Sequence, residues 1–168
     1  MMALRSVFEW VDTFPSSIVM RESVFWFPFL LTVHVASLCL FAGLIIMMDL
    51  RLLGVGNLRT PFSQIQKRLI QWQATGFLIN AATGGMLVYS QPMRYYGNVY
   101  FWVKMLMMAL AAVNAGAFHY STYYSVAKWD ADSKMPFGAK MSAVISLALW
   151  AFIIVSGRLM AYNWFTFI

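Results

Sequence analysis

The chain has 168 residues, of which 61% are apolar and 11% are charged, and its formal net charge is +6. This composition excludes an ordinary soluble domain and is typical of a protein embedded in a membrane. A nucleic-acid-binding protein would carry its positive charge on a soluble basic domain, which the sequence lacks. We therefore expect membrane lipids, and no nucleic acid, among its partners.

Residues 1–23 predict a short helix that lies in the membrane interface. Apolar residues recur at helical spacing: Leu4, Val7, Phe8 and Val11. Phe14 and Pro15 mark the expected end of this helix. Arg5, Glu9 and Asp12 interrupt the continuous apolar run that a cleaved signal peptide needs, so we expect the segment to stay attached.

Four longer stretches predict helices that cross the membrane, at residues 24–50, 66–91, 99–126 and 139–163. Each is long enough to span about 30 Å of hydrocarbon. A transmembrane β-barrel would show short segments of alternating polarity, whereas these runs are apolar on most sides. The sequence thus predicts one all-α domain over residues 1–168, an integral membrane four-helix bundle. The single Cys39 is expected to be a small core residue of the first crossing.

The basic residues of the loops predict the orientation of the bundle. The first and third loops carry Arg51, Arg59, Lys67, Arg68, Lys128, Lys134 and Lys140. The opposite side carries Arg5, Arg21 and Arg94. Because basic loop residues concentrate on the cytoplasmic side, we expect both termini on the other side.

Ionisable residues inside membrane helices are costly and mark candidate functional sites. The crossings hold five of them: His34, Asp49, Lys104, His119 and Arg158. Counted along the helices, His34, Lys104 and Arg158 lie at one level in the outer half. Asp49 and His119 follow His34 and Lys104 by fifteen residues, about 22 Å deeper. We therefore expect an outer cluster and an inner structural or proton-linked pair that joins Asp49 to His119, with Arg51 close by.

Each of these residues also has a purely structural interpretation. His34 fits the role of a metal or haem ligand, and it also fits the role of a hydrogen-bonded packing residue. His119 fits the role of a metal or haem ligand. It also fits the role of an interfacial residue that faces lipid headgroups among neighbouring tyrosines. Lys104 fits the role of a ligand, or that of a cation whose side chain extends to the membrane surface. Arg158 fits the role of a partner for a carboxylate, or that of an interfacial anchor.

Several sequence pieces together resemble a known superfamily. They are Arg21-Glu22-Ser23, Phe27-Pro28, His34, Asp49-Leu50-Arg51-Leu52-Leu53-Gly54, Gly76-Phe77, Lys104, Phe118-His119, Gly157-Arg158 and Ala161-Tyr162. The pattern resembles the superfamily of small membrane proteins that includes HemJ-type protoporphyrinogen oxidases and CopD copper-resistance domains. It is most similar to an uncharacterised bacterial membrane family within that group. The resemblance implies a bacterial inner (plasma) membrane, and the orientation expected from the basic loop residues then places both termini in the periplasm.

For HemJ-like proteins the resemblance implies a b-type haem held near the histidine of the first helix, with the lysine of the third helix beside it. On this sequence these residues are His34 and Lys104. A neutral imidazole binds iron well, and the planar cation of Arg158 suits haem propionates. His119 lies too deep to share a haem with His34, so it is expected to serve a second haem or to pair with Asp49.

Three functions stay open at this point. The first is a b-type haem protein that moves electrons to a quinone or a periplasmic redox partner. The second is a HemJ-like enzyme that oxidises a porphyrin, for which no catalytic residue is assigned. The third is a copper transporter or an accessory membrane subunit without a cofactor. Clustered thioethers suit Cu(I), although Met also fills irregular packing: Met47, Met48, Met105, Met107 and Met108. Small residues on the helix faces also favour a homo-oligomer.

Overall fold

The computed structural model describes residues 2–56, 59–130, 135–162 and 165–167. Within these ranges the secondary structure is helical, apart from one isolated β-bridge between Asn98 and Thr166. Lys134, which contributes to the expected orientation, and residue 163, the expected end of the last helix, lie outside the described residues.

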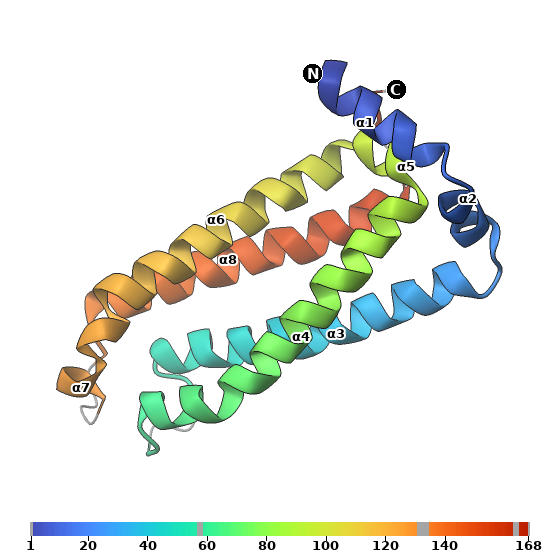
Figure 1. The fold of residues 1–168 in the computed structure, drawn as a ribbon. Coiled ribbons are helices and arrows are strands. Elements are labelled where there is room, and N and C mark those ends of the chain that lie inside the picture. The colour runs from blue at the N-terminus through green and yellow to red at the C-terminus, as the bar shows by residue number, and fades with distance from the viewer. Residues whose placement is uncertain (1, 57–58, 131–134, 163–164, 168) are drawn as a thin grey trace.

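The described residues form four long helices, which make up the body of the molecule (Figure 1). They are α3 (Trp26–Leu52), α4 (Phe62–Ser90), α6 (Val99–Ser121) and α8 (Phe137–Leu159). Three described segments are both long and apolar enough to cross a membrane: Trp26–Leu52, Val99–Ser125 and Phe137–Tyr162. The chain is therefore a helical protein that spans a membrane. The fourth helix, α4, is equally long but carries Gln, Asn and Thr side chains along its length.

The helix ends differ from the expected ones where local chemistry intervenes. α6 begins at Val99, as expected, because the side chain of Asn98 caps it by accepting a hydrogen bond from the Tyr100 N–H at 2.9 Å. α6 ends at Ser121 rather than near residue 126, and a 3-10 turn, η1 (Tyr123–Ser125), and a short helix, α7 (Val126–Trp129), follow it. α3 ends at Leu52, two residues before Gly54, whose φ of 92° lets the chain turn away.

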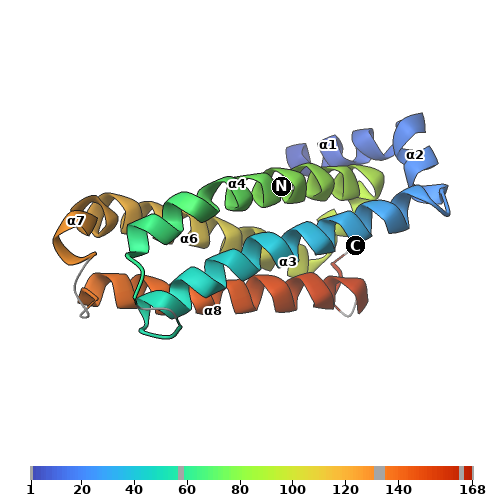
Figure 2. The same cartoon turned by 90° about the horizontal axis from the view of Figure 1, so that it is seen from below.

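The long helices form two hairpins. α3 packs along α4, α6 packs along α8, and the hairpins meet chiefly where α3 contacts α8. Figure 2 shows α3 lying between α4 and α8. Gly76 allows α3 and α4 to approach closely, because a Cβ there would lie 3.1 Å from Cβ of Phe41.

The buried core occupies two places between the hairpins. Near the middle, α3 and α8 contribute Ala42, Trp150 and Ile153, and Met107 of α6 packs against them. At the end near α7 the cluster consists of Met48, Leu52, Phe62, Trp129, Ala139 and Ala143. Asp130 closes that end, because its carboxylate accepts from the N–H and the hydroxyl of Ser63 in the first turn of α4.

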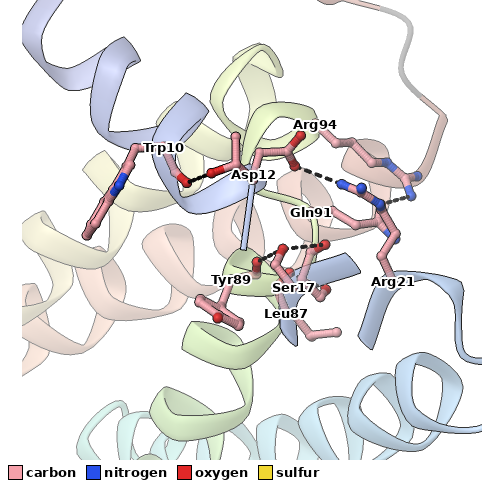
Figure 3. A network of polar contacts seen from close by, with 10 residues as sticks. Trp10, Asp12, Ser17, Arg21, Leu87, Tyr89, Gln91 and Arg94 are labelled. Atoms are coloured by element: carbon pink, nitrogen blue, oxygen red, sulfur yellow. Dashed lines mark hydrogen bonds and ion pairs between the residues drawn. The ribbon is translucent and has the colours of Figure 1, made fainter. Parts of the chain in front are cut away.

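The opposite end, which we call the capped end, carries α1 (Met2–Asp12), α2 (Pro15–Glu22) and α5 (Pro92–Tyr96). α1 ends before Pro15, as expected, whereas α2 was not expected. Figure 3 shows how this segment is fastened: Arg21 pairs with Asp12 at 2.7 Å, and the fully buried Ser17 hydroxyl donates to the Tyr89 carbonyl at 2.8 Å. The N-terminal segment is thus tied to the end of α4.

The C-terminal residues complete the capped end. After α8 the chain makes a 3-10 turn, η2 (Met160–Tyr162). The Val99 N–H then donates to the Phe165 carbonyl at 3.1 Å, and the Phe167 N–H donates to the Gly97 carbonyl at 3.0 Å. The two ends of the described chain therefore lie at the same end of the bundle.

One expectation about the core is wrong. Cys39 is exposed on α3 and is not a core residue. The neighbouring Leu38 and Phe41 pack against the middle cluster, so the surface of α3 that holds Cys39 points away from the other helices.

Ala143 offers a test of the packing at the α7 end. It is fully buried, so Ala143→Leu forces extra methyl groups into a filled core and is expected to lower the free energy of unfolding by about 1–3 kcal/mol. Ala148→Leu, at an exposed position of the same helix, is the matched control. Thermal unfolding in detergent measures both, and equal stability of the two variants would contradict the packing described here.

Candidate functional site

His34 lies eight residues into α3 and faces α4. Its Nδ1 atom is 3.1 Å from the carbonyl oxygen of Asn80 and 3.0 Å from the hydroxyl of Thr83. A carbonyl oxygen only accepts hydrogen bonds, so Nδ1 carries the hydrogen and Nε2 keeps its lone pair. The Thr83 hydroxyl donates to the Ile79 carbonyl at 2.7 Å, which leaves it as a second acceptor for the ring.

Two further contacts with α4 fix the position of His34. The Asn80 side-chain amide donates to the His34 carbonyl at 2.8 Å and to the Ser37 hydroxyl at 3.2 Å, which joins the backbones of α3 and α4. Gly84 leaves room for the ring, since a Cβ there would lie 3.0 Å from Cε1 of His34. The imidazole is therefore oriented by hydrogen bonds on one side and by close packing on another.

Lys104 lies in the first half of α6 and is half-buried against α8, where a Cβ on Gly157 would be 3.7 Å from its ammonium nitrogen. Lys104 and His34 lie on different hairpins, each in the first half of a helix that begins at the capped end. Among the described residues, neither side chain forms an ion pair with a carboxylate. The structure thus gathers two basic groups in the capped half of the bundle without an acidic partner.

Arg158 lies next to Gly157 near the end of α8 and is exposed. Its guanidinium carbon is 5.4 Å from the centre of the Tyr162 ring, a cation–π contact. Arg158 therefore lies at the same end of the bundle as Lys104, at the rim and not between the helices.

Asp49 and His119, the residues of the expected inner pair, have different surroundings in the structure. Asp49 is buried near the Ser146 hydroxyl of α8, while His119 is exposed and stacks on Tyr123 with ring centres 5.3 Å apart. In the described part of the chain, no ion pair joins Asp49 to His119 or to Arg51.

Helix geometry explains why Arg51 does not reach Asp49. Two residues of an α-helix are about 200° apart around its axis, so the two side chains leave α3 on opposite sides. Arg51 is buried instead against the loop after α3, and its Nη2 donates to the Thr60 carbonyl. Among the described residues, the structure therefore shows no ion pair between Asp49 and either His119 or Arg51.

The described His, Cys, Asp and Glu side chains do not cluster into a metal site. Over residues that the structure describes, no group of three or more His, Cys, Asp or Glu side chains is close enough to hold one ion. The clustered methionines also point in different directions, because Met47, Met105 and Met108 are exposed while Met107 packs into the middle cluster.

Sequence reasoning missed the polar residues that cross-link the helices. Asn80 and Thr83 stand three residues apart within an apolar stretch, so helical spacing alone places them on one face of α4. Asn114 of α6 plays the same part against α8, since its amide donates to the Ser142 carbonyl at 3.0 Å and its oxygen accepts from the Ser142 hydroxyl at 3.3 Å. Polar residues inside apolar runs are the signal that points to such contacts.

Comparison with known proteins gives one match. A family model described as a family of unknown function (DUF6644) matches residues 7–163. The chain belongs to this family. No curated protein and no solved structure matches it. The DUF6644 match covers both hairpins, so His34, its partners on α4, and Lys104 all lie within the region that defines the family.

Two adjacent glycines of this DUF6644 chain test the contact between α4 and His34. Gly85→Ala meets open space and is expected to stabilise α4 by up to about 1 kcal/mol, because alanine favours helix more than glycine does. Gly84→Ala forces the His34 ring away from Thr83 and the Asn80 carbonyl, so it is expected to be about 1–2 kcal/mol less stable than Gly85→Ala. Unfolding in detergent measures the difference, and equal stability would rule out the close contact.

Proposed function

We propose that the chain crosses a bacterial inner membrane four times, with the capped end and both termini in the periplasm. α3 and α6 both run from the capped end toward the α7 end (Figure 1). α4 connects the far end of α3 to the start of α6, so it has to return across the same thickness. At about 1.5 Å per residue its 29 residues exceed the ~30 Å of hydrocarbon. The basic loop residues support the proposed orientation.

Cysteines at the two ends of α4 test this topology. In a Cys39→Ser background, Arg94→Cys is expected to react with a membrane-impermeant maleimide in intact cells whose outer membrane admits the reagent. Arg59→Cys is expected to react only after the inner membrane is opened. Labelling of both positions from the same side would show that α4 does not cross.

We also propose that the protein is a membrane-embedded b-type haem protein that transfers electrons, with Nε2 of His34 as the iron ligand. One observation carries the proposal: Nδ1 of His34 donates to the backbone carbonyl of Asn80. Histidines that bind metals usually donate their other ring N–H to a carbonyl or carboxylate, which fixes the tautomer and orients the ring. The resemblance to the CopD and HemJ superfamily supports the same residue.

Other groups of the capped half fit this cofactor. Lys104 and Arg158 supply positive charge that suits the two carboxylates of a haem, and no acidic side chain in the described structure neutralises either of them by an ion pair. The Thr83 hydroxyl and the Asn80 carbonyl make the imidazole a stronger donor to iron. A haem bound there would supply one-electron chemistry, with a quinone or a periplasmic protein as the partner. His119 is exposed at the opposite end and has no part in the proposed site.

The chain has two histidines, which makes the test direct. Protein purified in detergent after expression with ample haem is expected to show a Soret band that His34→Ala abolishes or strongly shifts. His119→Ala is the matched control and is expected to keep the spectrum of the unsubstituted protein. Absence of the band in the unsubstituted protein, or an unchanged spectrum in His34→Ala, would reject the proposed ligand.

A further inference from the structure

Asp49 is a buried acid that the proposed haem site does not use. It lies fifteen residues after His34 on α3, about 22 Å further along the helix axis. Only 8% of the residue is exposed. Among the described residues, one carboxyl oxygen, Oδ2, has no hydrogen-bond partner, and the Ser146 hydroxyl of α8 lies near the carboxyl. The acid therefore lies in the contact between α3 and α8, which joins the two hairpins.

No described cation of α3, α4, α6 or α8 forms an ion pair with Asp49. Arg51, on α3 itself, leaves the helix on the other side and donates to the Thr60 carbonyl. The charged or titratable residues toward the same end of α4, α6 and α8 are exposed: Lys67, Arg68, His119, Tyr120 and Lys140. None of these described side chains forms an ion pair with the carboxyl of Asp49.

Three kinds of partner can relieve a buried carboxylate: a cationic side chain, a metal ion or a proton. The described cations do not pair with Asp49, as shown above. A hard metal ion takes six or more oxygen ligands or several carboxylates. The described residues offer one carboxyl and one hydroxyl here, and they contain no group of three acidic, histidine or cysteine side chains that could hold an ion. A proton needs no further ligand, because it turns the unpaired charge into a neutral group that tolerates apolar surroundings.

We propose that Asp49 is a proton-binding site in the seam between the two hairpins, where it carries a proton at neutral pH and shares a hydrogen bond with Ser146. The neighbours Met48 and Leu52 belong to the buried cluster at the α7 end, so the proton is held in an apolar layer. Loss of the proton places an uncompensated charge between α3 and α8, and that charge favours entry of water and separation of the hairpins there. Proton binding and hairpin contact are therefore coupled.

Infrared difference spectroscopy tests the site. The spectrum of the unsubstituted protein minus that of Asp49→Asn, at neutral pH, is expected to show the carbonyl stretching band of a protonated carboxyl, which moves in D₂O. Asp130→Asn is the control, because the Asp130 carboxylate accepts from Ser63 at the helix end and is expected to show carboxylate bands instead. Carboxylate bands in the Asp49→Asn difference would overturn the proposal.

Two further measurements test the proposal without the Asp49→Asn variant, in case that variant does not fold. In Ser146→Ala, the protonated-carboxyl band of Asp49 is expected to move to higher frequency, because its hydrogen bond is lost. In the unsubstituted protein, the apolar reagent dicyclohexylcarbodiimide is expected to add to the protonated acid, and mass spectrometry should find the adduct on Asp49 and not on the exposed Glu22. A band unmoved by Ser146→Ala, together with an unmodified Asp49, would overturn the proposal. The haem spectrum is a separate readout, so the two proposals fail independently.

Discussion

The arrangement of this protein depends on hydrogen bonds between polar side chains inside apolar helices. A membrane interior offers no water, so a polar side chain there has to find its partner on a neighbouring helix. Asn80 joins α4 to α3 through the His34 carbonyl and the Ser37 hydroxyl, and Asn114 joins α6 to α8 through Ser142. Within each hairpin, one asparagine thus sets how the two helices align along their length.

The contact between the hairpins has a different character. It consists mainly of apolar side chains, with Ala42, Trp150 and Ile153 near the middle, and Asp49 with Ser146 as its polar component. The two hairpins are therefore units that meet along one seam, and the ends of the bundle are closed by other segments. α1, α2, α5 and the C-terminal residues close one end, while α7 and the Asp130 bond to Ser63 close the other.

This architecture places two kinds of ionisable group in two places. The capped half gathers the basic groups His34 and Lys104, which suits an anionic ligand with a metal centre. The other half buries an acid, Asp49, which suits a proton. Because about 22 Å of helix separates them, each site has its own surroundings and its own chemistry.

Much of this could be read from the residues in order along the chain. Apolar length predicts the long helices, because the hydrocarbon thickness sets a minimum number of residues, and the depth of His34 and Lys104 follows from the helical rise. Depth does not give direction around the helix axis, and the inner pair shows the limit. Asp49 and His119 share a level, yet one is buried against Ser146 and the other stacks on Tyr123 at the surface.

The sequence by itself therefore determined that this is a helical membrane protein and which residues are costly to bury, since both follow from composition and spacing. The tertiary structure decided which helices pair, which nitrogen of His34 is free, and that Cys39 lies outside the core. The physical reason is that these features depend on the rotation of each helix about its axis. Interactions between helices far apart in the chain set that rotation, among them the close approach of Phe41 to Gly76 and the hydrogen bonds of Asn80.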